Sequence, residues 1–123
     1  MIVGLDTSVV VRLLVGEPAE QAQRARSLLD ARMHAGQAPV WLSALVISEA
    51  YFALRHHYHV PANEALIALR ALVADARVQT PPAVQEVLQT EELERARPGF
   101  MDRLIHADYR SLGATLVSFD RDL

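Results

Sequence analysis

Short apolar segments alternate with longer segments of helical periodicity along the whole chain of 123 residues. The predicted strands cover residues 2–5, 40–42, 77–80 and 114–119. The predicted helices cover residues 9–15, 18–34, 43–58, 83–96 and 100–112, with a further helix that begins at Pro61. Short buried strands separated by helices are typical of parallel sheets that helices cover. The pattern therefore predicts one domain over residues 1–123, an α/β sandwich with a parallel sheet.

Two residue types are missing from the sequence. The chain has no Cys, and all 12 of its basic residues are Arg, so it has no Lys. The first absence excludes disulfides and cysteine-held metals, and the second excludes phosphate-binding loops and Schiff bases that need a lysine. A formal net charge of −3 argues against a protein that coats nucleic acid, although it leaves room for a local Arg cluster.

The first residues predict neither export nor membrane insertion. The segment Met1-Ile2-Val3-Gly4-Leu5 has no basic residue before Asp6, unlike a signal peptide. No apolar stretch approaches the roughly 20 residues that a membrane-spanning helix needs. We therefore expect a cytoplasmic protein without a membrane partner.

Two acidic residues follow predicted strands directly. Asp6 comes after residues 2–5, and Asp120 comes after residues 114–119. Taken alone, each fits an ordinary helix cap or turn residue. Ligands of parallel sheets bind beyond the carboxyl ends of the strands. If the two strands are neighbours, Asp6 and Asp120 share one crevice.

Two further acids lie within predicted helices. Glu49 falls inside an apolar stripe and either faces the core with a partner or metal, or reaches water from the edge of that stripe. Asp102 lies in the first turn of its helix, where acids commonly complement the helix dipole. The stripe that contains Glu49 consists of Leu45, Val46, Phe52 and Ala53.

The four acids together suggest a metal site. Converging carboxylates raise the pKa of one or more of their members unless a divalent cation neutralises them. Oxygen ligands favour Mg²⁺ or Mn²⁺ over zinc or copper. Such an ion lowers the pKa of a bound water and stabilises charge on a phosphodiester, which is the chemistry of a metal-dependent nuclease.

The ordered set of these motifs resembles the PIN-domain ribonucleases, and within them the VapC toxins of bacterial type II toxin–antitoxin pairs. The resemblance covers essentially the whole chain, and the set is more specific than any single motif. It rests on Leu5-Asp6-Thr7-Ser8-Val9, Ser48-Glu49-Ala50, Met101-Asp102-Arg103-Leu104-Ile105 and Leu116-Val117-Ser118-Phe119-Asp120-Arg121-Asp122.

The resemblance implies a three-layer α/β/α sandwich with a short central parallel sheet. It also implies an endoribonuclease that cleaves single-stranded or loop RNA with a water activated by Mg²⁺ or Mn²⁺. It also implies a homodimer and inhibition by a cognate VapB-like antitoxin. Carried over by position, Asp6 and Asp102 would bind the metal directly, and Glu49 and Asp120 would bind it or orient its waters. The supporting hydroxyls of the family fall on Thr7 and Ser8.

The sequence departs from the family pattern at three places. Gly99 stands where many relatives have another acid, and the sequence ends at Leu123, before a terminal segment that many relatives carry. Asp108 is either an additional acid behind the metal ligands or a solvated helix position. Two alternatives remain beside the toxin: a PIN-fold processing nuclease without an antitoxin, and a catalytically inactive PIN-fold binding module.

Overall fold

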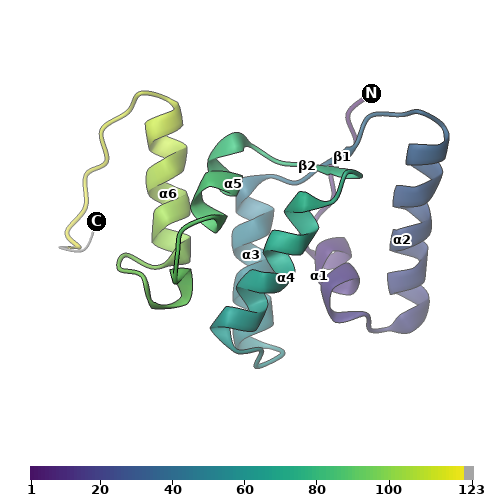
Figure 1. Ribbon diagram of the computed structural model, residues 1–123, viewed down its shortest axis with the longest axis horizontal. Helices are drawn as coiled ribbons and strands as arrows, with labels where there is room; N and C mark the ends of the chain where they lie inside the picture. Colours follow the sequence, from purple (N-terminus) through teal and green to yellow (C-terminus); the bar gives the residue numbers. More distant parts are fainter. Residues whose placement is uncertain (121–123) are drawn as a thin grey trace.

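The structure is a computed structural model that describes residues 1–120, so residues 121–123 of the predicted domain lie outside it. Figure 1 shows a small parallel sheet with helices packed around it, which confirms the predicted α/β class. Its elements in chain order are α1 (Thr7–Val15), α2 (Ala19–His34), β1 (Val40–Trp41), α3 (Ala44–His56), α4 (Ala62–Ala74), β2 (Val78–Gln79), α5 (Pro82–Leu88), the 3₁₀ helix η1 (Leu93–Arg95) and α6 (Phe100–Ser111).

The sheet is smaller than the sequence predicts. Strands β1 and β2 are parallel, with Val40 opposite Val78. The predicted first strand, residues 2–5, forms only an isolated parallel bridge between Gly4 and Trp41. The Trp41 amide donates to the Val3 carbonyl over 2.8 Å, and the Leu5 amide donates to the Trp41 carbonyl over 3.1 Å. The N-terminal segment therefore lies beside β1 in parallel, and Asp6 follows directly.

Local capping explains where several helices begin and end. Gly16 ends α1 with a φ of 80°, in the left-handed region that Gly adopts without a steric penalty. The Ser43 hydroxyl accepts a hydrogen bond from the Val46 amide over 3.1 Å and so caps α3. Both boundaries agree with the sequence prediction.

Helix α3 buries a different face from the predicted one. Ile47, Ala50 and Leu54 point into the core, whereas Leu45 is 68% exposed and Phe52 is 49% exposed. Apolar residues occupy most positions of this helix, so periodicity alone allows two apolar stripes. The stripe that contains the charged Glu49 is the one that faces outward.

Helix α5 is shorter than predicted. It ends at Leu88 rather than at residue 96, and the chain continues through Glu92, whose φ is 50°, into η1. Leu93 is buried, so packing of this one side chain stabilises a bend that the helical pattern did not indicate. None of the helices within residues 1–120 is both long and apolar enough to cross a membrane.

The predicted last strand, residues 114–119, is wrong for this structure. In the described chain these residues form no strand, and Val117 and Phe119 are exposed. Figure 1 shows this segment on the outer side of α6, far from the N-terminus. A strand needs a neighbouring backbone to satisfy its amides and carbonyls, and here the segment has none of the sheet within reach. Asp120 therefore does not follow a strand.

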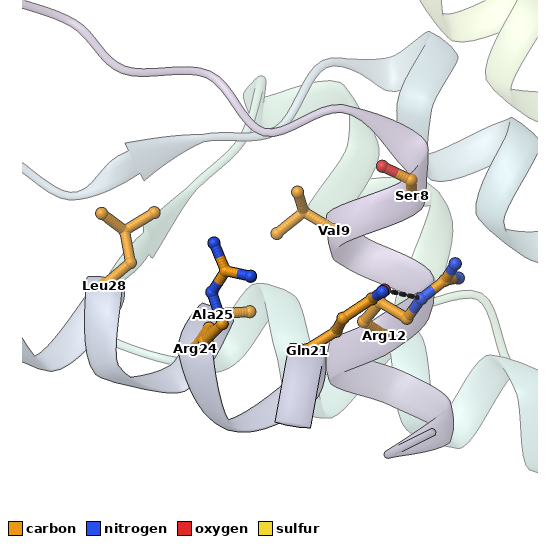
Figure 2. Close-up of a pocket in the computed structure, with 7 residues that line it drawn as sticks. All are labelled: Ser8, Val9, Arg12, Gln21, Arg24, Ala25 and Leu28. Atoms are coloured by element: carbon orange, nitrogen blue, oxygen red, sulfur yellow. Dashed lines mark hydrogen bonds between the residues drawn. The ribbon is translucent and has the colours of Figure 1, made fainter. Parts of the chain in front are cut away.

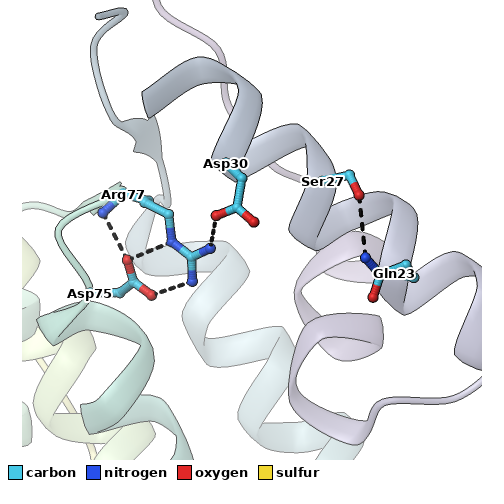
Figure 3. Close-up of polar contacts among 5 residues, drawn as sticks. All are labelled: Gln23, Ser27, Asp30, Asp75 and Arg77. Atoms are coloured by element: carbon cyan, nitrogen blue, oxygen red, sulfur yellow. Dashed lines mark hydrogen bonds and ion pairs between the residues drawn. The ribbon is translucent and has the colours of Figure 1, made fainter. Parts of the chain in front are cut away.

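A charged cluster at the start of β2 ties the sheet to α2 (Figure 3). The Arg77 guanidinium contacts both carboxylate oxygens of Asp75, at 3.0 Å and 2.7 Å, and reaches Asp30 on α2 at 2.6 Å. Arg77 and Asp75 are about three-quarters buried. The hydrogen bond from the Arg77 side chain is the main reason why the pKa of Asp75 lies below its ordinary value.

We predict that Arg77→Ala destabilises the domain by about 1–2 kcal/mol near neutral pH, because the substitution leaves the Asp75 carboxylate without its bidentate partner. The lowered pKa of Asp75 means that this stabilisation is present above the ordinary value of 3.8 and is lost as the pH falls through the folded value. Urea unfolding at neutral pH and at about pH 3 measures both effects.

Arg26→Ala is the matched control, because Arg26 is an exposed residue of α2 whose side chain donates to Gln23 Oε1 over 3.2 Å and forms no ion pair within residues 1–120. We expect it to change the free energy of unfolding by at most about 0.5 kcal/mol. A loss in Arg77→Ala that persists unchanged at low pH would show that packing, rather than the ion pair, carries the effect.

Candidate active site

Asp6 caps the first helix at the point where the N-terminal segment leaves the sheet. Its Oδ1 accepts hydrogen bonds from the Ser8 hydroxyl at 2.6 Å, the Ser8 amide at 3.0 Å and the Val9 amide at 3.4 Å. Among the described residues no group donates to Oδ2, and the side chain is exposed. One carboxylate oxygen is thus fixed by the helix terminus, while the other faces solvent.

These hydrogen bonds keep Asp6 ionised. The Ser8 hydroxyl, followed by the Val9 amide, holds the pKa of Asp6 below its ordinary value. From the sequence, a raised pKa is expected where carboxylates converge without a divalent cation. The effect on Asp6 has the opposite sign, because donors rather than other acids surround its carboxylate.

Thr7 connects the first helix to the second acidic residue of the predicted site. Its hydroxyl donates to Glu49 Oε2 over 2.7 Å, joining the first turn of α1 to the middle of α3. Glu49 is exposed, in agreement with the alternative that it reaches water rather than the core. The structure therefore connects Glu49 to the turn formed by Asp6, Thr7 and Ser8.

Asp102 lies in the first turn of α6 and is half-buried. Packing holds this turn against α3, because the ring of Phe100 meets the ring of Tyr51 edge to face with centroids 4.9 Å apart. Tyr51 follows Glu49 by two residues. The start of α6 is thus anchored to the same stretch of α3 that carries Glu49, although no hydrogen bond among the described residues joins Asp102 to the other acids.

The other two predicted acids lie elsewhere. Asp120 is exposed beyond the end of α6, where its amide donates to the Ser118 hydroxyl over 2.9 Å. Asp108 is exposed on α6 and lines a cavity of about 410 Å³ between α3 and α6, together with Ser48 and Leu45. It lies on a solvated helix position, and within residues 1–120 no hydrogen bond joins its side chain to Asp6.

The four acids do not converge in the structure. Within residues 1–120, no three Asp, Glu or His side chains are placed so that they could hold a metal ion. The donor chemistry of Asp6 and Glu49 still fits Mg²⁺ or Mn²⁺, since both are exposed oxygen ligands and Asp6 Oδ2 is available. Asp6 and Glu49 are therefore the candidate ligands that the described chain offers to such an ion.

A groove beside Asp6 was not predicted from the sequence. It measures about 450 Å³ and lies between α1 and α2 (Figure 2). One signal could have revealed it: residues 21, 24 and 28 of α2 recur at helical spacing and share one face. The side chains that line the groove include Ser8, Val9, Arg12, Gln21, Arg24 and Leu28.

We predict that Ser8→Ala raises the pKa of Asp6, because the Ser8 hydroxyl contributes most to lowering it. An NMR titration that follows the Asp6 carboxyl carbon measures the shift. Ser111→Ala serves as the control, since the Ser111 hydroxyl donates to the Asp108 carbonyl at the far end of α6. An unchanged Asp6 titration in Ser8→Ala would contradict the assigned cause.

Comparison with known proteins places this geometry in a family. The family model described as PIN domain matches residues 3–123, which is nearly the whole chain. A search of curated proteins and a search of solved structures each returned no match. Members of the matched family are generally metal-dependent nucleases. The described fold, a mostly helical α/β arrangement with a short parallel sheet, is consistent with this match, and the chain belongs to the PIN domain family.

Proposed function

We propose that the chain is an endoribonuclease that depends on Mg²⁺ or Mn²⁺ and acts in the cytoplasm as the toxin of a type II toxin–antitoxin pair. Its substrate would be single-stranded or loop RNA. Membership of the PIN domain family supports the nuclease class. The observation that carries the proposal is the hydrogen bond from the Thr7 hydroxyl to Glu49 Oε2 over 2.7 Å, which ties Glu49 to the residue that directly follows Asp6.

The residues around Asp6 suit cation binding. The Ser8 hydroxyl holds the pKa of Asp6 low, so the carboxylate stays charged and available to a divalent ion. The Thr7 hydroxyl fixes the rotamer of Glu49 by binding Oε2, which leaves Oε1 for a ligand. A divalent ion held by these carboxylates would supply a water of lowered pKa and neutralise charge on the phosphodiester.

Asp102 and Asp120 complete the proposed metal site. Asp102 lies in the first turn of α6, and Phe100 of that turn packs against Tyr51 of α3. Asp120 reaches the site if residues 114–119 return to the open side of the N-terminal segment, opposite β1. The Gly4 amide and carbonyl point toward that side, because the neighbouring Val3 carbonyl and Leu5 amide bond to β1. The proposal therefore requires that the end of the chain lie differently when the site is assembled.

The first experiment incubates the purified protein with total bacterial RNA and Mn²⁺ or Mg²⁺. We expect discrete cuts that carry 5′-phosphate and 3′-hydroxyl ends, since a water rather than a ribose 2′-hydroxyl attacks the phosphorus. Asp6→Asn and EDTA should each abolish the cuts. Asn remains a good N-cap, so Asp6→Asn is expected to preserve α1.

Glu64→Gln is the matched control, because Glu64 is an exposed acid in the first turn of α4 and within residues 1–120 forms no hydrogen bond or ion pair with the site. It should cut as the wild type does. Products that end in 2′,3′-cyclic phosphate would contradict hydrolysis by water. Cleavage without any toxicity that a neighbouring gene product relieves would favour a processing nuclease, and absence of both cleavage and metal binding would favour an inactive binding module.

The apolar surface of α3 and α6 supports a second copy of this chain as partner. Leu45 and Ile105 are exposed and line the same cavity between the two helices. Tyr109 and Leu112 continue the row on α6, and Phe52 continues it on α3. Exposed apolar patches of this kind are typical of protein–protein interfaces. The cognate VapB-like antitoxin remains a proposal that the resemblance alone supports.

We predict that the wild type is a homodimer and that Ile105→Arg converts it to a monomer, because a charge would be buried without a partner at the interface. Light scattering coupled to size-exclusion chromatography measures the molar mass of each variant. Ile67→Arg is the control, since Ile67 is similarly exposed on α4 and lies outside this row. A monomeric wild type at high concentration would contradict this assignment.

A further inference from the structure

We propose that the groove between α1 and α2 binds the phosphate backbone of the substrate strand, with Arg12 and Arg24 as its phosphate contacts. This inference rests on the proposed function, because it assigns the path of the RNA on one side of the cut. The groove is about 450 Å³ in volume and is lined by side chains of both helices (Figure 2).

The groove is positively charged, whereas the chain as a whole has a negative net charge. The protein has 15 acidic and 12 basic residues, yet none of the acids within residues 1–120 lines this groove. Two guanidinium groups that share one cavity repel each other, and an anion between them removes that repulsion. Phosphate is well suited, because guanidinium binds phosphate oxygens with paired hydrogen bonds.

Both guanidinium groups are available to a ligand. Arg12 Nε donates to Gln21 Oε1 over 2.7 Å, which orients the guanidinium and leaves its terminal nitrogens without a described partner. Arg24 is exposed and makes no ion pair or hydrogen bond within residues 1–120. Arg77 differs from these two residues, because its guanidinium already forms ion pairs with Asp30 and Asp75. Figure 2 shows the Arg24 side chain extending from α2 into the space beside Val9.

The position of the groove favours RNA over another polyanion. Ser8 lines the groove and also donates to Asp6 Oδ1 over 2.6 Å, so one end of the groove adjoins the proposed reaction centre. A strand whose phosphodiester reaches Asp6 carries further phosphates on either side, one for each nucleotide. Val9 and the half-exposed Leu28 offer apolar surface to a ribose or an unstacked base.

The test measures RNA binding in the absence of cleavage. Fluorescence anisotropy follows a short fluorescein-labelled single-stranded RNA titrated with Asp6→Asn protein in EDTA. Adding Arg24→Gln or Arg12→Gln to this parent should weaken binding about tenfold and reduce the salt dependence by about one phosphate contact. Arg24→Lys should recover part of the affinity, because it restores the charge without the planar fork.

Arg26→Gln is the matched control, since Arg26 lies on the same helix, binds Gln23 and does not line the groove. It should bind RNA as the parent does. Equal losses in Arg26→Gln and Arg24→Gln, or no loss in Arg24→Gln, would overturn the proposal. So would an Asp6→Asn parent that does not bind the RNA.

Two further outcomes separate the groove from the nuclease activity. Poly-glutamate that displaces the RNA as well as unlabelled RNA does would overturn the assignment to nucleic acid and point to an acidic peptide. RNA binding that depends on Arg24, in a wild-type protein that never cuts RNA with Mn²⁺ or Mg²⁺, would support the groove and contradict the proposed nuclease function.

Discussion

The junction between the N-terminal segment and α1 positions the rest of the candidate site. Parallel hydrogen bonds of Val3 and Leu5 with β1 fix the direction in which the chain leaves the sheet. Asp6 then uses one carboxylate oxygen to cap α1, with the Ser8 hydroxyl and amide as its closest donors. A side chain that satisfies a helix terminus has few rotamers left. The second oxygen of Asp6 is therefore presented in a defined direction.

The same junction links the candidate acids to the groove. Thr7 reaches across to Glu49 on α3, and Ser8 turns toward the space between α1 and α2 that Arg12 and Arg24 line. Three consecutive residues thus have three roles: Asp6 caps α1, Thr7 binds a second carboxylate, and Ser8 lines the basic groove. Neighbouring residues can make these different contacts because successive side chains of a helical turn point in different directions around its axis.

Much of the fold could be predicted from the sequence because the signals were local. Gly16 and Ser43 mark helix boundaries through their own backbone or side-chain chemistry, and both predictions are confirmed. The burial of α3 was not predictable from periodicity, because the helix has two apolar stripes and only contact with its neighbours selects Ile47 over Leu45. The bend before Leu93 likewise depends on a distant packing partner rather than on the residues beside it.

The sequence by itself determined the residue types that can act: an Arg-only set of cations, acids at the ends of predicted elements, and hydroxyls directly after Asp6. Tertiary structure decided which of them meet. It joins Glu49 to Thr7 and brings Arg24 to the groove beside Ser8, and it leaves the segment of residues 114–119 on the outer side of α6. The physical reason is that capping depends on neighbours along the chain, whereas convergence depends on how helices and strands pack across it.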